Sequence, residues 1–194
     1  MDYFDHSLQQ NAIYKEAKNE HWTPFNSTLR AIPEPANKPA GYAGPELTAS
    51  DLEALDARWI NPELAQAARL RRVDSFIGAE LVGRKSGDYS GIAIPYSLPG
   101  STEVREYRLR CDHPEMEVDS NGRVKPKQKY LSPPGRGNML YFAPGTAEEQ
   151  LRDVSLPLVV TEGEFKTLAL RRLANWNNVE RPRFVPVGVS GVYN

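Results

Sequence analysis

The stretch from Leu156 to Leu170, LPLVVTEGEFKTLAL, decides how the C-terminal part of this chain folds. Leu158, Val159 and Val160 form a short continuous apolar run, which is the pattern of a strand covered on both faces, as in a parallel sheet. Gly163 follows between two glutamates and allows the backbone to turn tightly. Carboxylates at the carboxyl end of a parallel strand lie where open α/β sheets bind ligands. The stretch therefore predicts a strand, a turn that carries a carboxylate, and a helix.

Helical spacing of apolar residues follows the turn. The residues expected to face inward are Phe165, Leu168, Ala169 and Leu173, and those expected to face water are Lys166, Arg171 and Arg172. A second apolar run, Phe184 to Val189, comes after about the length of one βαβ crossover. A helix that begins at Gly163 turns Glu164 away from Glu162, so Glu162 is the stronger candidate to face a site.

Two sets of residues carry a resemblance to a known family. Val160-Thr161-Glu162-Gly163-Glu164 resembles the first motif of the toprim domain, a metal-dependent module shared by bacterial-type primases, topoisomerases and some nucleases. The second set occurs in the order found just upstream of toprim in primase-like proteins: Gly91 to Tyr96, Tyr107 to Arg110, Lys129 to Gly135, and Asn138 to Phe142. From about Leu47 to Asn194 the chain is thus similar to a toprim-like family of unassigned function, found in primase and primase-helicase proteins of plasmids, phages and other mobile elements.

The resemblance implies metal-dependent nucleotidyl transfer in the complete protein, as primer synthesis during DNA replication of a mobile element. It implies Mg²⁺ or Mn²⁺ as the cofactor and Glu162 as the catalytic residue, either as a metal ligand or as a general base. Glu164 is the weaker second candidate for a metal ligand. Toprim proteins complete the site with a later Asp-x-Asp, which does not occur before Asn194. We therefore expect the chain to end inside the toprim domain, to bind Mg²⁺ weakly and to be inactive alone.

The fold class expected is α+β, in four parts. Residues 1–45 carry five prolines and little periodic apolar content, and are expected to form a flexible arm, with a possible short docking helix around Leu8 to Asn19. Residues 46–86 are expected to form a helical subdomain, residues 87–148 a β-rich, primase-like subdomain, and residues 149–194 the first βαβ unit of an incomplete toprim domain.

Helix signals mark the second part. Thr48, Ser50 and Asp51 offer N-caps for one helix, and Pro62 suits the first position of the next, whose inward residues are expected to be Leu64, Ala67, Ala68 and Leu70. Two short helices could form a helix-turn-helix. A small helical subdomain that packs on a sheet is favoured over it, because several acidic residues of this part would repel phosphates.

The β-rich part carries a basic stretch. Gly91 to Tyr96 and Val104 to Arg110 are predicted strands, and Asn121-Gly122 predicts a hairpin turn. The candidate contacts to nucleic acid or nucleotide are the cations Arg108, Arg110, Arg123, Lys125, Lys127, Lys129 and Arg136, together with Lys166 from the later helix. The lysines at 125, 127 and 129 share one face of an extended segment; the alternative is that they only keep an edge strand from aggregating.

Composition bounds these expectations. The net charge of -1 argues against a uniformly basic nucleic-acid binder, and the single cysteine, Cys111, excludes an internal disulfide and a cysteine-rich zinc site. No apolar run approaches the ~20 residues of a membrane helix, so cytoplasm is the expected location. Expected partners are single-stranded DNA, nucleotides and a helicase domain in the same or another chain. Two alternatives remain: a toprim-type nuclease, and a non-catalytic module that binds nucleic acid or a helicase.

Overall fold

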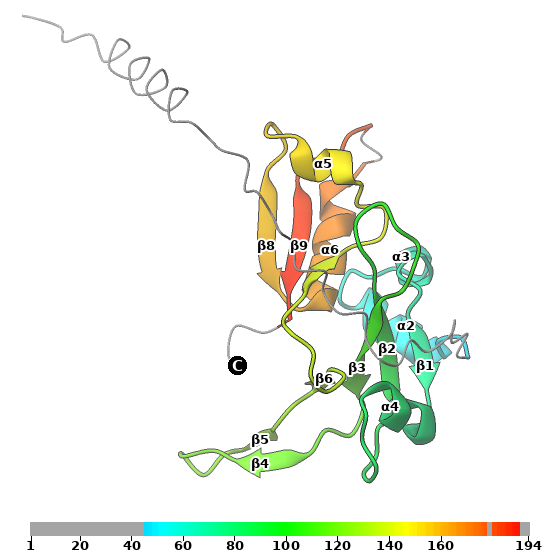
Figure 1. Cartoon of the computed structure of the whole chain (residues 1–194), viewed down its shortest axis with the longest axis vertical. Helices are drawn as coiled ribbons and strands as arrows, with labels where there is room; N and C mark the ends of the chain where they lie inside the picture. The colour runs from blue at the N-terminus through cyan, green and yellow to red at the C-terminus, as the bar shows by residue number, and fades with distance from the viewer. Residues whose placement is uncertain (1–44, 178–179, 191–194) are drawn as a thin grey trace, which may run out of the picture. The chain divides into compact units, whose positions relative to one another are not determined.

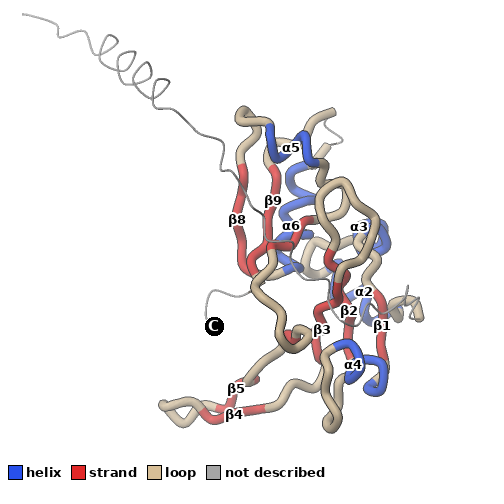
Figure 2. The backbone as a smooth tube through the Cα atoms, in the orientation of Figure 1, coloured by secondary structure: helices blue, strands red, loops and turns tan. Residues whose placement is uncertain are grey.

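The computed structural model of this protein describes residues 45–177 and 180–190, which belong to one compact unit of α+β architecture (Figure 1). The arm at residues 1–45 and its possible helix lie outside the described residues, apart from Pro45. In the described part, no helix is long and apolar enough to cross a membrane. Figure 2 shows how the helices and strands of this unit are distributed along the backbone.

The described residues form three sheets. The first is antiparallel, has the order β1-β2-β3-β6, and consists of β1 (Arg71–Val73), β2 (Gly91–Tyr96), β3 (Glu106–Cys111) and β6 (Tyr130–Leu131). The second is the hairpin of β4 (Met116–Val118) and β5 (Val124–Pro126). The third has the order β7-β9-β8 and consists of β7 (Leu140–Phe142), β8 (Leu158–Glu162) and β9 (Val185–Val189), with β8 and β9 parallel.

The first two helices begin at the residues that the sequence predicts. In α2 (Ala49–Asp56) the Thr48 hydroxyl accepts a hydrogen bond from the Asp51 backbone N–H at 3.2 Å, and the Asp51 carboxylate accepts one from the Thr48 N–H at 2.9 Å. In α3 (Pro62–Ala67), Asn61 is the cap and the proline stands first, as expected. Of the predicted inward residues, Ala67 is exposed, and Ala65 is buried in its place.

The expectation of a helical subdomain over residues 46–86 is wrong in one segment. Arg69 has a left-handed backbone (φ 52°) that ends α3, and the chain then extends as β1 and pairs with β2. Helix resumes only at α4 (Ser75–Leu81), where the Asp74 carboxylate accepts from the Ile77 N–H at 2.8 Å. The strand was missed because three residues with two arginines carry no period-2 signal.

Strand β2 matches its predicted bounds, and β3 begins two residues later than predicted. Tyr107, Leu109 and Cys111 are buried on one face of β3, with α4 packed nearby. The opposite face carries Glu106, Arg108 and Arg110, which pair in register with Tyr96, Ile94 and Ile92 of β2. That face belongs to the main hydrophobic core, so the predicted basic face of β3 points inward rather than to water.

The main core joins residues of the 46–86, 87–148 and 149–194 parts of the chain. Leu55 and Leu70 come from the N-terminal part, Ile94 from β2, and Phe165 and Leu168 from the C-terminal helix α6 (Glu164–Ala174). A smaller core holds Leu156, Val185 and Val187, with side chains of β7 and of α5 (Glu148–Arg152) against it.

The C-terminal βαβ unit is formed by β8, α6 and β9, but β8 is not covered on both faces. Leu158 and Val160 are 54% and 64% exposed, because β8 is the edge strand of its sheet and α6 covers only the other face. Two expectations for α6 are also wrong. Leu173 is exposed because it lies about 140° around the helix from Leu168, and Arg171 is half-buried, with a hydrogen bond of 3.1 Å to the Gly145 carbonyl.

Candidate functional site

Glu162 is the last residue of β8, at the carboxyl end of a parallel strand pair. Its register partner on β9 is Val189, so two parallel strands end side by side at this point. The Glu162 side chain is 56% exposed, and the Lys166 ammonium lies 4.0 Å from its carboxylate. An accessible carboxylate therefore stands where ligands bind in α/β sheets.

The turn after Glu162 requires a glycine and is held by backbone hydrogen bonds. Gly163 has φ +82°, a conformation that side chains with a Cβ rarely adopt. Its N–H donates to the Val189 carbonyl at 2.9 Å, and its carbonyl accepts from the Thr167 hydroxyl at 2.9 Å. The turn is thereby tied both to β9 and to the first turn of α6.

Register places Glu162 on the face of the sheet away from α6. Tyr141, Gly188 and Thr161 form one row across the three strands, and a Cβ added to Gly188 would meet the Thr167 hydroxyl at 2.4 Å, so this row faces α6. Successive side chains of a strand alternate between faces, so Glu162 faces the other side.

Glu164, two residues later, is fully buried and points to the first sheet. Its Oε1 accepts a hydrogen bond of 2.7 Å from Arg108 Nη1 and another from the Tyr96 hydroxyl. Burial, and then the Glu164 charge, raise the pKa of the Tyr96 hydroxyl. Burial lowers the pKa of Arg108, but the Glu164 charge and the hydrogen bond to Glu164 together outweigh burial, so the net shift of the Arg108 pKa is upward.

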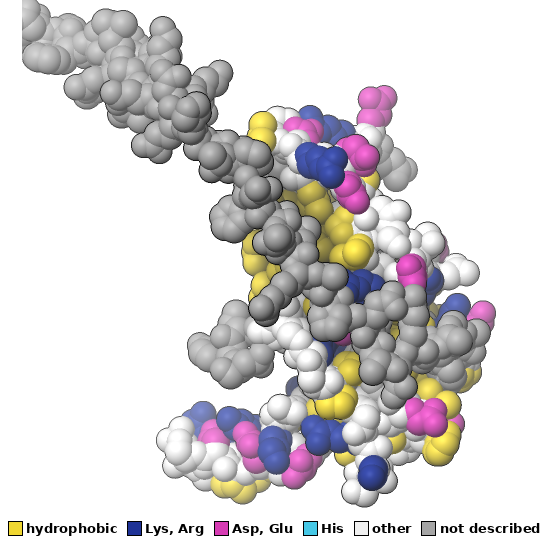
Figure 3. Space-filling view, viewed as in Figure 1, with side chains coloured by type: hydrophobic (Ala, Val, Ile, Leu, Met, Phe, Trp, Pro, Cys, Tyr) yellow, Lys and Arg dark blue, Asp and Glu magenta, His cyan; other side chains and the backbone are white. Residues whose placement is uncertain are grey.

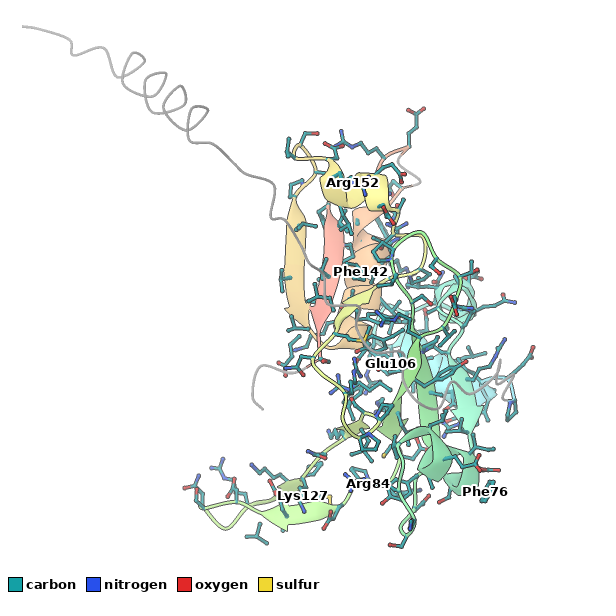
Figure 4. All side chains as sticks on the ribbon, viewed as in Figure 1. Phe76, Arg84, Glu106, Lys127, Phe142 and Arg152 are labelled. Carbon is teal, nitrogen blue, oxygen red and sulfur yellow. The ribbon has the colours of Figure 1, made fainter. Side chains whose placement is uncertain are left out.

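A second buried ion pair lies beside the first. Arg136 Nε is 2.5 Å from Glu106 Oε1, and the Arg136 guanidinium stacks 4.4 Å above the centre of the Tyr96 ring. Burial raises the pKa of Glu106, and the Arg136 charge offsets part of that rise. Figure 4 labels Glu106, which lies among densely packed side chains by β2 and β3. Arg136 and Arg108, both predicted contacts to nucleic acid, are thus internal counter-ions.

The three lysines of the predicted row are exposed: Lys125 lies on β5 of the β4–β5 hairpin, Lys127 follows that strand, and Lys129 precedes β6. Two of these lysines are paired across the hairpin with glutamates at 3.4 Å: Lys125 with Glu117, and Lys127 with Glu115. Figure 3 shows Lys or Arg and Asp or Glu side chains intermingled there, and Figure 4 labels Lys127 on this hairpin. The hairpin is therefore a mixed surface rather than a purely basic one.

The other predicted cations differ in surroundings. Arg123 and Lys129 are exposed and form no ion pair with any residue that the structure describes. Arg110 is half-buried and stacks over the Phe165 ring at 5.6 Å, which brings it next to the start of α6. Lys166 is exposed beside Glu162. Arg123 and Lys129 are therefore the exposed cations of the predicted set that have no ion pair among the described residues.

The described residues do not form a complete metal site. Over residues 45–177 and 180–190, no group of three or more His, Cys, Asp or Glu side chains is arranged to hold a metal ion. Mg²⁺ requires several oxygen ligands in near-octahedral geometry, and Glu162 supplies one carboxylate. Glu164 Oε1 is already shared by Arg108 and Tyr96, and the two glutamates point to different sides of the turn.

Two cavities in the described part lie away from Glu162. One, of about 260 Å³, lies between the ends of β2 and β7 and is lined by Arg69 and Ser97 among others. The other, of about 630 Å³, is lined by Arg84, Cys111 and His113 among others. Glu162 lines neither, so the candidate site is an open edge of a sheet.

Comparison of the chain with family models, curated proteins and solved structures gives no match.

Sequence reasoning missed the partners of Glu164. Tyr96 was assigned only to a strand, and Glu106 was not singled out at all. Arg108 and Arg110 alternate with apolar residues in the sequence, a pattern that predicts a basic face and contacts to nucleic acid rather than an internal ion pair. The useful signal in the sequence is Glu106 on the same face of the strand, because a face that only binds phosphate would not carry a negative charge.

Proposed function

We propose that this chain is part of a primase-like protein of the toprim type, and that Glu162 is its catalytic residue. The observation that carries the proposal is the geometry of the turn. An exposed carboxylate ends a parallel strand, a glycine with positive φ follows, and a helix leads to the neighbouring parallel strand. The sequence motif and this geometry support each other, because both require strand, Glu-Gly turn and helix in that order.

The role proposed for Glu162 is that of a proton acceptor. It would take the proton from the hydroxyl of a growing strand as the hydroxyl oxygen attacks the α-phosphorus of an incoming nucleoside triphosphate, and the bond from that phosphorus to pyrophosphate breaks. Because the described residues do not fit a complete metal site, no step is assigned to a metal here; Mg²⁺ or Mn²⁺ remains an expectation for the complete protein.

Single-stranded DNA is the proposed partner. The main contacts would come from Arg123 and Lys129, which are exposed and have no ion pair among the described residues, with Arg110 and Lys166 beside the Glu162 turn. Lys125 and Lys127 would contribute less, because each is already paired with a glutamate.

The test is template-dependent incorporation of labelled nucleotide by the complete protein. Glu162→Gln should lower incorporation by about 100-fold or more, the usual contribution of a general base. The matched control is Glu148→Gln, which changes an exposed glutamate at the start of α5 and should leave the rate unchanged. Full activity of Glu162→Gln would refute the assignment, and nicking without incorporation would support a nuclease instead.

The absence of a metal-binding group among the described residues also favours a second candidate, a non-catalytic module that binds nucleic acid. That module would bind single-stranded DNA equally well with or without Mg²⁺, and Glu162→Gln would leave binding and biological activity intact. Calorimetry with and without Mg²⁺, and complementation with the variant, separate the two candidates.

A further inference from the structure

Glu164 is the only acidic residue of the described part that is fully buried, and its carboxylate joins two sheets. It is the first residue of α6, and both hydrogen-bond partners of its Oε1 belong to the first sheet: Tyr96 at the end of β2 and Arg108 in the middle of β3. The contact therefore ties the beginning of α6 to two strands that lie more than 50 residues earlier in the chain.

The same carboxylate is separated from Glu162 by Gly163 alone. The glycine is fixed to β9 through its N–H and to Thr167 through its carbonyl. Arg110 adds a second contact, because its guanidinium stacks on Phe165, the residue after Glu164. The direction in which Glu162 leaves the sheet edge is thus set by backbone bonds on one side and by the Glu164 contacts on the other.

Stability alone does not account for this arrangement. Glu164 Oε2, Arg108 Nε and Arg136 Nη2 are buried without a hydrogen-bond partner among the residues that the structure describes. Buried polar atoms without partners are costly, and a buried ion pair is often no more stable than an apolar pair of the same volume. What the ion pair adds is a defined direction, because the guanidinium and the phenol hydroxyl converge on one oxygen.

We propose that Glu164 is a positioning residue: with Arg108 and Tyr96 it holds the Glu162–Gly163 turn in the orientation that Glu162 needs for catalysis. Glu164 does not touch the substrate and acts only through Glu162. The catalytic part of this inference rests on the proposed function. The structural part is that the ion pair holds the turn locally, and it does not depend on that function.

The structural part is tested by hydrogen exchange of the chain. In Glu164→Gln the charge is lost but the side-chain shape is kept, and exchange of the amides from Gly163 to Thr167 should accelerate on the order of 100-fold. The amides from Ala169 to Ala174, in the second half of α6, should change far less. Glu148→Gln, the same substitution at the first residue of α5, is the control and should change neither segment. A uniform acceleration along α6, or none, would overturn the inference.

The catalytic part is tested by kinetics of the complete protein, below the temperature at which any variant unfolds. Glu164→Gln should lower kcat by roughly 10-fold to 100-fold with little change in KM for template or nucleotide, as expected when a reacting group is misplaced. Arg108→Lys, which keeps the charge opposite Glu164, should retain more of kcat than Arg108→Gln. Unchanged kcat in Glu164→Gln would contradict the positioning role.

The two proposals fail differently. If Glu162→Gln is inactive but Glu164→Gln is not, the function stands and the positioning role is wrong. If the complete protein incorporates no nucleotide, the proposed function is wrong, and the exchange measurement still decides whether the ion pair holds the turn.

Discussion

The β4–β5 hairpin and the contact between β3 and α6 both bring a cation opposite a glutamate, and they differ in burial. On the hairpin, Lys127 and Glu115 lie 3.4 Å apart with both side chains more than half exposed. At the other contact, Arg108 and Glu164 are 2.7 Å apart, with side chains 12% and 0% exposed. Water screens the first pair, whereas the second has lost its hydration and depends on its partner. Similar charge pairs in sequence therefore serve different purposes: one keeps a surface mixed, and the other fixes a turn.

The largest effect is expected at the buried pair. Arg108→Met leaves the Glu164 carboxylate buried without its counter-ion, and should lower the free energy of unfolding by about 3–5 kcal/mol. Urea denaturation followed by circular dichroism measures it. Arg108→Lys is the control and should lose less, because the charge stays. A loss below about 1 kcal/mol for Arg108→Met would show that water already reaches Glu164.

Packing around α6 gives the next effect. A Cβ at Gly188 would come within 2.4 Å of the Thr167 hydroxyl and 3.2 Å of the Tyr141 Cβ, whereas nothing lies within 4 Å of a Cβ at Gly137. Gly188→Ala should therefore destabilise the protein by about 1–3 kcal/mol, and Gly137→Ala should have almost no effect. Equal midpoints of thermal unfolding for the two variants would mean that α6 can move away from β9 without cost.

The ion pair of Asp51 and Arg72 is partly buried, and it makes the stability of the fold depend on pH. Burial by itself raises the pKa of Asp51, but hydrogen bonds from Arg72 and Thr48 outweigh it and hold that pKa below its usual value. Asp51 therefore stabilises the fold fully above the unfolded-state pKa of about 3.9, and this stabilisation is lost as pH falls through the lower, folded value.

Asp51→Asn should accordingly lower the free energy of unfolding by about 1–3 kcal/mol at pH 7. The difference in free energy of unfolding between this variant and the unchanged protein should narrow as pH falls below about 4. Denaturation at a series of pH values measures this difference. A difference that stays constant down to pH 2 would show that the Asp51 charge does not contribute.

The smallest effect on stability is expected on the hairpin. Replacing both Lys125 and Lys127 by Gln removes two exposed ion pairs and should change the free energy of unfolding by less than about 1 kcal/mol. The same variant should reduce the salt dependence of single-stranded DNA binding by at most about 0.7 in slope per lost phosphate contact. Arg123→Gln with Lys129→Gln should reduce it more, because these two cations have no glutamate opposite them among the described residues. A larger reduction in salt dependence for the Lys125 and Lys127 variant would show that these lysines leave their glutamates to contact DNA.

The sequence predicted much of the fold where local signals were strong. The apolar runs of β2, β8 and β9, the Thr48 cap, Pro62 and the Asn121-Gly122 turn all carry their signal within a few residues, and the structure confirms them. Strand β3 was also predicted, although it begins two residues later than expected. Which of its two faces meets the core was not predictable, because that depends on α6, which begins more than 50 residues later.

The candidate site was predictable only in part. Glu162 and its glycine turn follow from the motif. The expectation that a helix starting at Gly163 directs Glu164 away from Glu162 is also correct. The destination of Glu164 was not visible, because its contacts with Tyr96 and Arg108 join segments 68 and 56 residues apart. The exposure of Leu158 and Val160 was likewise missed, since a local apolar run does not say whether its strand is at the edge of a sheet.

The most direct test of the account is a double-mutant cycle for the Glu164–Arg108 pair, with Glu164→Leu, Arg108→Met and both together, measured by urea denaturation. Each single change leaves one buried charge without its opposite charge, and the double change removes both charges. We therefore predict that the double variant loses about 2–3 kcal/mol less free energy of unfolding than the two single variants lose together. The same cycle at Lys127 and Glu115, with Gln at both positions, should give less than about 0.5 kcal/mol. Additive losses at Glu164 and Arg108, within about 0.5 kcal/mol, would contradict the claim that this ion pair holds the turn.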